Sequence, residues 1–249
     1  SKKERNIVAF HEAGHTVIGV VLDEAETVHK VTIVPRGQAG GYAVMLPKED
    51  RFFMTKPELL DKIVGLLGGR VAEEIVFGEV STGAHNDFQR ATAIARSMVT
   101  EFGMSDKLGP LQFGQSQGSQ VFLGRDFNND QNYSDAIAYE IDLEIQRIIK
   151  DCYARAKQIL TENREKLDLI ANTLLEIETL DAEQIKHLCE HGKLPERTYK
   201  SLNGNFEQVE GDVKININKK EEKVEAATES AEVDLKKLQD DEPSEKKED

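Results

Sequence analysis

Residues 7–22 read IVAFHEAGHTVIGVVL, a strongly apolar stretch with two histidines and a glutamate near its centre. Its apolar flanks predict a helix that is buried around most of its circumference. Each buried polar group costs about 1–3 kcal/mol unless a partner satisfies it. His11 and His15 are four positions apart and therefore share one helical face, where they can bind one zinc ion, with Glu12 in reach of a water beside it.

This HExxH pattern also has an ordinary explanation, because it arises by chance in about one chain in a hundred of this length. A histidine on an apolar helix face is often only a hydrogen-bonded core residue. Three polar residues in one apolar helix are harder to accommodate without a metal, so zinc is the favoured interpretation. The sequence thus predicts a zinc helix from Lys3 to about Leu22.

The chain has 249 residues, 39% of them hydrophobic, with no tryptophan and a formal net charge of -14. This length allows one substantial core, or one core and a tail. The negative charge argues against nucleic acid as a partner, since phosphate binding needs a positive surface. Cys152 and Cys189 form no CxxC motif, and we expect them to be reduced core thiols in a cytosolic setting.

The sequence has no stretch long and apolar enough for a membrane span, no signal peptide and no GxxxxGK[ST] phosphate loop. Its zinc helix begins almost at residue 1, and the first residue is Ser, so we expect a domain taken from a longer protein. Residues 219–249 carry 12 acidic residues, 7 lysines and no aromatic residue. Such a composition predicts disorder, and we divide the chain into a globular domain at 1–202 and an acidic, disordered tail at 203–249.

The apolar pattern predicts a mainly α fold, a helical bundle around the zinc helix with one small β-hairpin. The hairpin strands are expected at 27–34 and 42–46. Thr55 opens a capping box for a helix to Phe77, in which Gly68-Gly69 either interrupts the helix or lets another helix pack closely. There follow a polar loop at 81–87, a helix at 88–102, long loops at 103–133 with an apolar island at 121–123, and three helices between Ser134 and Gly192.

The predicted strand at 27–34 has two possible uses. An exposed strand edge beside a zinc site would hold an extended peptide by main-chain hydrogen bonds, without requiring one particular sequence. Alternatively, the hairpin only covers the core. The pattern does not choose between them.

Two histidines are too few for a catalytic zinc site, which usually takes three protein ligands and leaves one position for water. The metzincin extension is excluded, because Ile18 and Val21 stand where it needs Gly and His. The remaining candidates are Glu73 and Glu74 on the helix that ends at Phe77, Asp87 near the start of the next helix, and His85. Spacing alone does not choose among them.

Several separate blocks appear in one order: AFHEAGH at 9–15, GGRVAEE at 68–74, STGAHNDF at 81–88, FGMS at 102–105 with LGP at 108–110, NYSD at 132–135, LDAEQI at 180–185 and LP at 194–195. Together they resemble the peptidase domain of the FtsH family of bacterial, membrane-anchored AAA+ zinc proteases. The resemblance covers roughly residues 3–200, and the acidic tail has no part in it.

The resemblance implies one zinc ion per chain, bound by His11, His15 and Asp87, with Glu12 as the general base. It also implies a mostly α-helical metallopeptidase domain that forms a hexamer under an ATPase ring. That ring threads unfolded or membrane-extracted proteins into the proteolytic chamber. ATP would bind only in the ATPase module, and the membrane would be reached only through an N-terminal anchor, both outside this chain. The expected location is the cytoplasmic side of the cell membrane, while the fragment itself would be soluble.

Two other functions compete with this interpretation. The first is a non-catalytic helical oligomerisation module whose metal site is structural or missing. Glu12 argues against it, because a structural site needs ligands and has no use for a base. The second is a zinc hydrolase that cleaves short peptides but not unfolded proteins.

Overall fold

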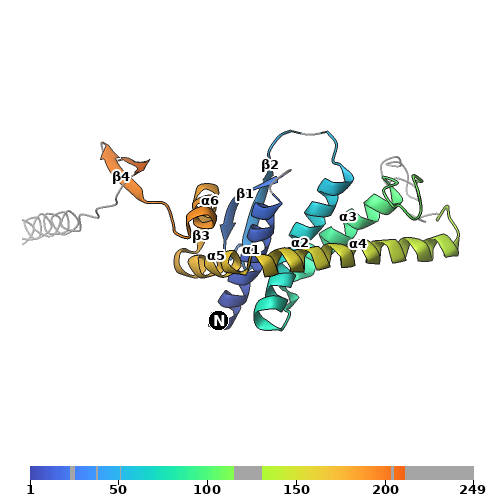
Figure 1. The fold of residues 1–249 in the computed structure, drawn as a ribbon, viewed down its shortest axis with the longest axis horizontal. Helices are drawn as coiled ribbons and strands as arrows, with labels where there is room; N and C mark the ends of the chain where they lie inside the picture. The colour runs from blue at the N-terminus through green and yellow to red at the C-terminus, as the bar shows by residue number, and fades with distance from the viewer. Residues whose placement is uncertain (23–25, 38, 51, 115–130, 203–204, 211–249) are drawn as a thin grey trace, which may run out of the picture. The chain divides into compact units, whose positions relative to one another are not determined.

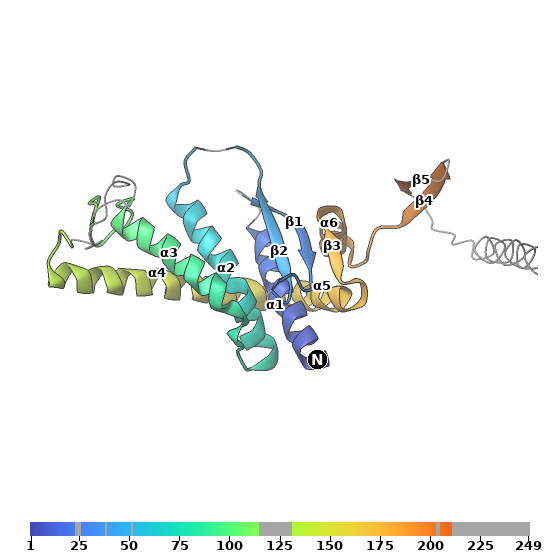
Figure 2. The same cartoon turned by 180° about the vertical axis from the view of Figure 1, so that it is seen from behind.

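The computed structural model describes residues 1–22, 26–37, 39–50, 52–114, 131–202 and 205–210, with the backbone alone for 197–210. These ranges contain six α-helices, a three-stranded sheet and a separate two-stranded sheet (Figure 1, Figure 2). The predicted mainly α fold is therefore confirmed. The chain divides into two compact units, Ser1–Leu194 and Pro195–Asp249. None of the helices in these ranges is long and apolar enough to cross a membrane.

Helix α1 (Lys2–Val21) contains the HExxH stretch and is the predicted zinc helix. Ser1 caps its start by accepting a hydrogen bond from the backbone N–H of Glu4. Helix α1 packs against helices α2 (Lys56–Phe77), α4 (Asp135–Glu162) and α5 (Arg164–Ile177) and against strand β1 (Glu26–Thr32). This explains why its apolar residues are spread around most of the helix, with Ala9, Ala13 and Val17 completely buried.

Strands β1 (Glu26–Thr32) and β2 (Tyr42–Pro47) form the predicted antiparallel hairpin. A third strand, β3 (Thr179–Asp181), pairs with β1 on its other side, so the order is β2-β1-β3. This corrects the expectation of an exposed edge at 27–34, because β1 is the central strand. β2 is an edge strand of the described sheet. The three residues of β3 lie between two helices and are too few to show an alternating pattern.

Helix α2 (Lys56–Phe77) begins with the predicted capping box at Thr55 and ends at Gly78. It continues through Gly68-Gly69, so these glycines serve close packing and do not interrupt the helix. A Cβ atom at Gly14 would lie 2.4 Å from the carbonyl oxygen of Gly68. Gly14 and Gly68 therefore allow α1 and α2 to cross with their backbones in contact.

A short 3-10 turn, Thr82–Ala84, leads into helix α3 (His85–Thr100). The predicted polar loop therefore ends earlier than expected, and Asp87 lies in the first helical turn. Of the predicted long loops at 103–133, residues 103–114 and 131–133 contain no helix or strand. The apolar island at 121–123 lies outside the described residues.

Three further helices complete the first unit: α4 (Asp135–Glu162), α5 (Arg164–Ile177) and α6 (Ala182–His191). Ser134 caps α4 as predicted, and Gly192 ends α6. Both cysteines are free thiols; Cys152 is buried on α4, where burial raises its pKa to about 11.

The second unit contains a hairpin that the sequence did not predict, formed by β4 (Arg197–Leu202) and β5 (Asn205–Glu210). The predicted tail at 203–249 lies mostly outside the described residues, so the domain division at 202 stays a prediction.

Candidate metal centre

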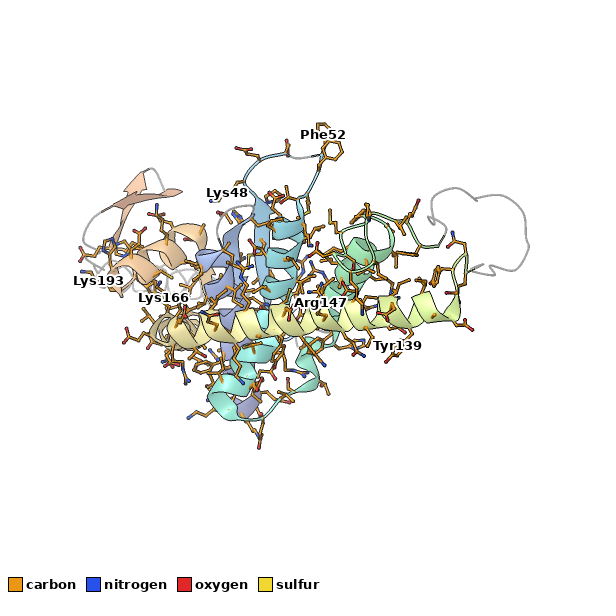
Figure 3. The ribbon with its side chains drawn as sticks, turned by 45° about the vertical axis from the view of Figure 1, so that its right-hand side comes forward. Lys48, Phe52, Tyr139, Arg147, Lys166 and Lys193 are labelled. Carbon is orange, nitrogen blue, oxygen red and sulfur yellow. The ribbon has the colours of Figure 1, made fainter. Side chains whose placement is uncertain are left out.

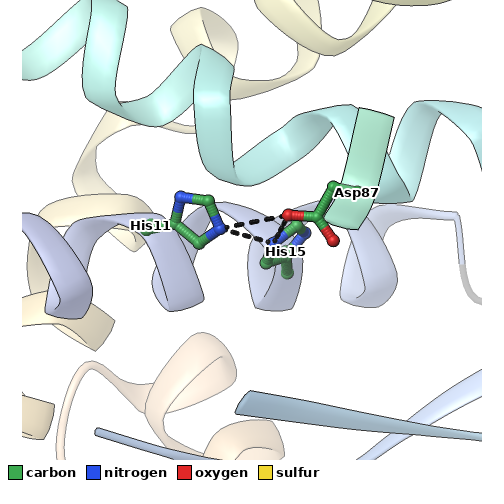
Figure 4. Close-up of side chains that lie close together, drawn as sticks. All are labelled: His11, His15 and Asp87. Atoms are coloured by element: carbon green, nitrogen blue, oxygen red, sulfur yellow. Dashed lines mark hydrogen bonds and ion pairs between the residues drawn. The ribbon is translucent and has the colours of Figure 1, made fainter. Parts of the chain in front are cut away.

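Three side chains converge between α1 and α3: His11 and His15 from one face of α1, and Asp87 from the first turn of α3 (Figure 4). The Nε2 atoms of the two histidines are 3.1 Å apart. The Oδ2 atom of Asp87 lies 3.3 Å from Nε2 of His11 and 3.4 Å from Nε2 of His15. The structure thus brings together the two motif histidines and the aspartate named by the resemblance.

The spacing of these three atoms fits a tetrahedral zinc ion. Zinc binds histidine nitrogen and carboxylate oxygen at about 2.0–2.2 Å, which puts neighbouring tetrahedral ligands about 3.3 Å apart. The donor set is also appropriate, because two imidazoles and one carboxylate are ligands that zinc accepts in catalytic sites. Among the described residues no fourth His, Cys, Asp or Glu joins this group, so the set leaves room for a water or a substrate atom.

The other ring nitrogen of each histidine is also held. Nδ1 of His11 lies 2.7 Å from Oε1 of Glu73, and Nδ1 of His15 lies 2.8 Å from the carbonyl oxygen of Gly65. Such outer partners fix the ring orientation and leave Nε2 to face the ion. Burial opposes protonation of His11, but its hydrogen bonds to Asp87 and Glu73 prevail and raise its pKa to about 9. In Asp87, hydrogen bonds to both histidines outweigh burial and lower the pKa.

The two glutamates that were candidates for the third ligand have other partners. The carboxylate of Glu73 accepts hydrogen bonds from the backbone N–H and the hydroxyl of Ser81, at 2.6 and 3.1 Å, and it holds His11. Glu74 accepts hydrogen bonds from Tyr153 and Lys157. Sequence reasoning missed the contact between Glu73 and His11. This contact could have been expected, because a histidine that binds zinc through one ring nitrogen usually has a hydrogen-bond partner on the other.

Glu12 follows His11 on α1 and is 6% exposed. Among the described residues its carboxylate has no hydrogen-bond partner, although its side chain lines the groove described below. Burial raises the pKa of Glu12, and the two neighbouring histidines oppose this rise. A carboxylate with a raised pKa beside a metal centre has the properties of a general base.

A family model described as "Peptidase family M41" matches residues 1–188. This chain belongs to peptidase family M41. It is 80% identical over 224 residues to the "ATP-dependent zinc metalloprotease FtsH" of Bacillus subtilis, covering 90% of this chain and 34% of that protein. The same name is carried by relatives from Staphylococcus haemolyticus, 72% identical over 80% of this chain and 27% of the relative, and from Streptococcus pneumoniae, 52% identical over 79% and 29%.

The predicted resemblance to FtsH is therefore confirmed, and membership of this peptidase family supports the predicted enzyme class, a zinc metalloendopeptidase. The chain spans about a third of the length of the curated relatives that it matches.

The M41 domain has a groove whose lining includes the three residues of the candidate metal centre. Helix α1 contributes His11, Glu12 and His15 to the lining, β2 contributes residues 42–45, and α2 contributes residues from Glu58 to Leu66. The start of α3 adds His85, Asn86, Asp87 and Arg90. His85 lines the groove but is not part of the three-ligand group. A Cβ atom at Gly41 would lie 2.9 Å from Cγ of Glu12, so β2 begins directly beside this carboxylate.

Proposed function

We propose that this chain is the catalytic domain of an ATP-dependent, membrane-anchored protease and hydrolyses peptide bonds of unfolded or membrane-extracted proteins. The observation that carries the proposal is the placement of Glu12, a buried carboxylate without a hydrogen-bond partner among the described residues, beside three converging side chains that could hold a metal ion in one groove. A structural metal site has no need of such a carboxylate.

In this proposal His11, His15 and Asp87 bind one zinc ion per chain. When bound, zinc lowers the pKa of water towards 7 and polarises the scissile carbonyl group. Both imidazoles would be neutral when they hold the ion, because metal binding displaces the ring proton that His11 carries in its absence. Two neutral imidazoles and one carboxylate leave a net charge of about +1 on a divalent ion. Glu73 and the Gly65 carbonyl keep both imidazoles in the orientation that turns Nε2 to the ion.

Glu12 acts as the general base and then as the general acid. Its carboxylate accepts a proton from the attacking water and delivers this proton to the nitrogen of the leaving amine. The raised pKa of Glu12 suits both steps, because the protonated form is easier to reach than in an ordinary exposed glutamate. Burial also excludes bulk water that would otherwise compete for the proton.

The substrate main chain lies along the outer edge of β2 in this proposal, in place of the strand at 27–34 considered from the sequence. β2 is an edge strand of the described sheet, it lines the groove, and it begins beside Glu12. Main-chain hydrogen bonds to an edge strand accept many sequences, as a protease for unfolded proteins requires.

The ATP dependence and the zinc requirement rest on the names of the relatives, which are ATP-dependent zinc metalloproteases. The hexameric ring, the N-terminal membrane anchor and the cytoplasmic location are taken from the family resemblance. ATP binds only in an ATPase module that lies outside this chain.

The Glu12→Gln variant tests the catalytic proposal. It keeps the shape of the side chain and removes the base, so we expect unchanged zinc content and loss of peptide cleavage. Glu79→Gln is the control, because Glu79 is an exposed acid whose side chain is 77% accessible. Full turnover in Glu12→Gln would disprove the role of this residue.

The same measurements separate the two competing functions. An oligomerisation module would cleave neither short peptides nor unfolded protein with zinc present. A small-peptide hydrolase would cleave short peptides but leave an unfolded protein intact.

A further inference from the structure

Two phenylalanines are almost completely exposed in the loop that joins β2 to α2. Phe52 is 98% exposed and Phe53 is 88% exposed, and Figure 3 shows Phe52 projecting from the far end of this loop. Met54, the next residue, is 38% exposed. Covering an exposed phenylalanine side chain is favourable because it removes a large apolar area from water. Adjacent exposed aromatics therefore indicate a surface that gains free energy when an apolar partner covers it.

The position of this aromatic loop (residues 48–50 and 52–55) connects it with the groove. β2 and α2 line two sides of the groove, and α1 contributes the residues of the metal centre. The loop runs from the end of β2 to the start of α2 (Figure 1, Figure 2). Met54 itself lines the groove together with Val44, Met45 and Leu66. Met54, which follows the two exposed phenylalanines in the chain, thus connects them with the apolar part of the groove lining.

A second copy of the chain is a weaker candidate for the partner. Two phenylalanine side chains bury about 150–250 Å² each, whereas a stable interface needs about 800 Å² from each partner. An extended polypeptide does not need an area of about 800 Å² at the two phenylalanines. In the proposed function, its main chain also binds along β2 and at the metal centre.

We propose that Phe52 and Phe53 form an outer subsite that binds apolar side chains of the unfolded polypeptide, several residues away from the scissile bond. This inference rests on the proposed function and adds a preference to it. The enzyme favours segments that a folded protein would keep buried, since only these present apolar side chains to the loop.

The test uses two peptides of equal length that share one central, cleavable sequence. One carries Leu and Phe on both flanks, and the other carries Ser and Thr there. Three proteins are compared, each loaded with zinc: the wild type, the double variant Phe52→Ser/Phe53→Ser, and Tyr139→Ser. Tyr139 lies on α4 and is 63% exposed, so it controls for the removal of an exposed aromatic outside the groove (Figure 3).

We expect the wild type and Tyr139→Ser to cleave the apolar-flanked peptide with a KM about tenfold lower than that of the polar-flanked one. The double variant should lose this difference, while its kcat for the polar-flanked peptide stays the same. If the double variant keeps the preference, or if the wild type has none, the outer subsite does not exist.

Two further measurements keep the proposal testable. If the wild type cleaves neither peptide, the catalytic proposal fails, and binding of both labelled peptides, followed by fluorescence anisotropy, still tests the subsite. Sedimentation velocity reports the oligomeric state of all three proteins. A double variant that dissociates but keeps its peptide preference would assign the two phenylalanines to a contact between copies, against the proposal.

Discussion

Gly69 provides the space in which the imidazole of His11 lies. A Cβ atom at Gly69 would be only 2.4 Å from Nε2 of His11, the nitrogen proposed to bind zinc. We therefore predict that Gly69→Ala displaces this ring and weakens zinc affinity by about tenfold or more. Gly65→Ala is the matched control, since it lies on the same helix and a Cβ atom there meets nothing within 4 Å. Competition with a chelator measures both affinities, and equal values would contradict the prediction.

Glu73 supports the metal centre without belonging to the proposed ligands. The Glu73 carboxylate stabilises the ring orientation of His11 in which Nε2 faces the ion. In Glu73→Gln a neutral amide, which is a weaker hydrogen-bond acceptor, takes the place of this carboxylate. Zinc affinity should fall about 10–100-fold, as is usual when the outer partner of a zinc-bound histidine is changed. Glu74→Gln is the control, because Glu74 accepts its hydrogen bonds from Tyr153 and Lys157 and is not part of the three-ligand group. Complete loss of zinc in Glu73→Gln alone would instead favour Glu73 as a ligand.

Single residues also mark the limit of prediction from sequence. The spacing of His11 and His15 places them on one helical face, because an α-helix repeats every 3.6 residues. Asp87 is 72 positions beyond His15 on another helix, and no periodicity relates two helices whose packing is unknown. Only the family resemblance favoured it over Glu73 and Glu74.

At the scale of elements, a buried hydrogen bond joins the loop after α3 to helix α4. The hydroxyl of Ser105, which is 3% exposed, donates to Glu144 at 2.6 Å, and the same carboxylate accepts from Arg147. Ser105→Ala leaves this bond unmade in a buried place, so the free energy of unfolding should fall by about 1–3 kcal/mol.

Ser97→Ala is the control for this prediction, because its hydrogen bond to Glu101 is exposed and should change stability by less than about 0.5 kcal/mol. Urea denaturation followed by circular dichroism measures both variants. Equal midpoints would show that the Ser105 contact contributes nothing to the fold.

The helices were predictable because each repeats its apolar residues at helical spacing, and α2 and α4 also carry caps, at Thr55 and Ser134. The sheet was less predictable. β3 has three residues, and its pairing with β1 joins positions about 150 residues apart, so no local pattern indicates it. This pairing makes β1 the central strand, and it moved the proposed peptide-binding edge to β2.

At the scale of the whole molecule, the unit Ser1–Leu194 contains the metal centre, the groove and the buried core. Deleting residues 203–249 should therefore leave zinc content, peptide cleavage and the melting temperature of this unit unchanged. Calorimetry and a peptide assay on the 1–202 protein check this. A melting temperature lower by more than about 4 °C, equivalent to about 1 kcal/mol in a domain of this size, would contradict the predicted domain division.

The most direct test of the central claim is the zinc content per chain, measured by mass spectrometry of the metal in the wild type, Asp87→Ala and Asp135→Ala. Asp135 also lies in the first turn of a helix, but outside the metal centre. We predict about one zinc ion per chain in the wild type and in Asp135→Ala, and much less in Asp87→Ala. Equal zinc in the wild type and Asp87→Ala would contradict the proposed ligand set, and no zinc in any of the three proteins after zinc is supplied would contradict the metal centre itself.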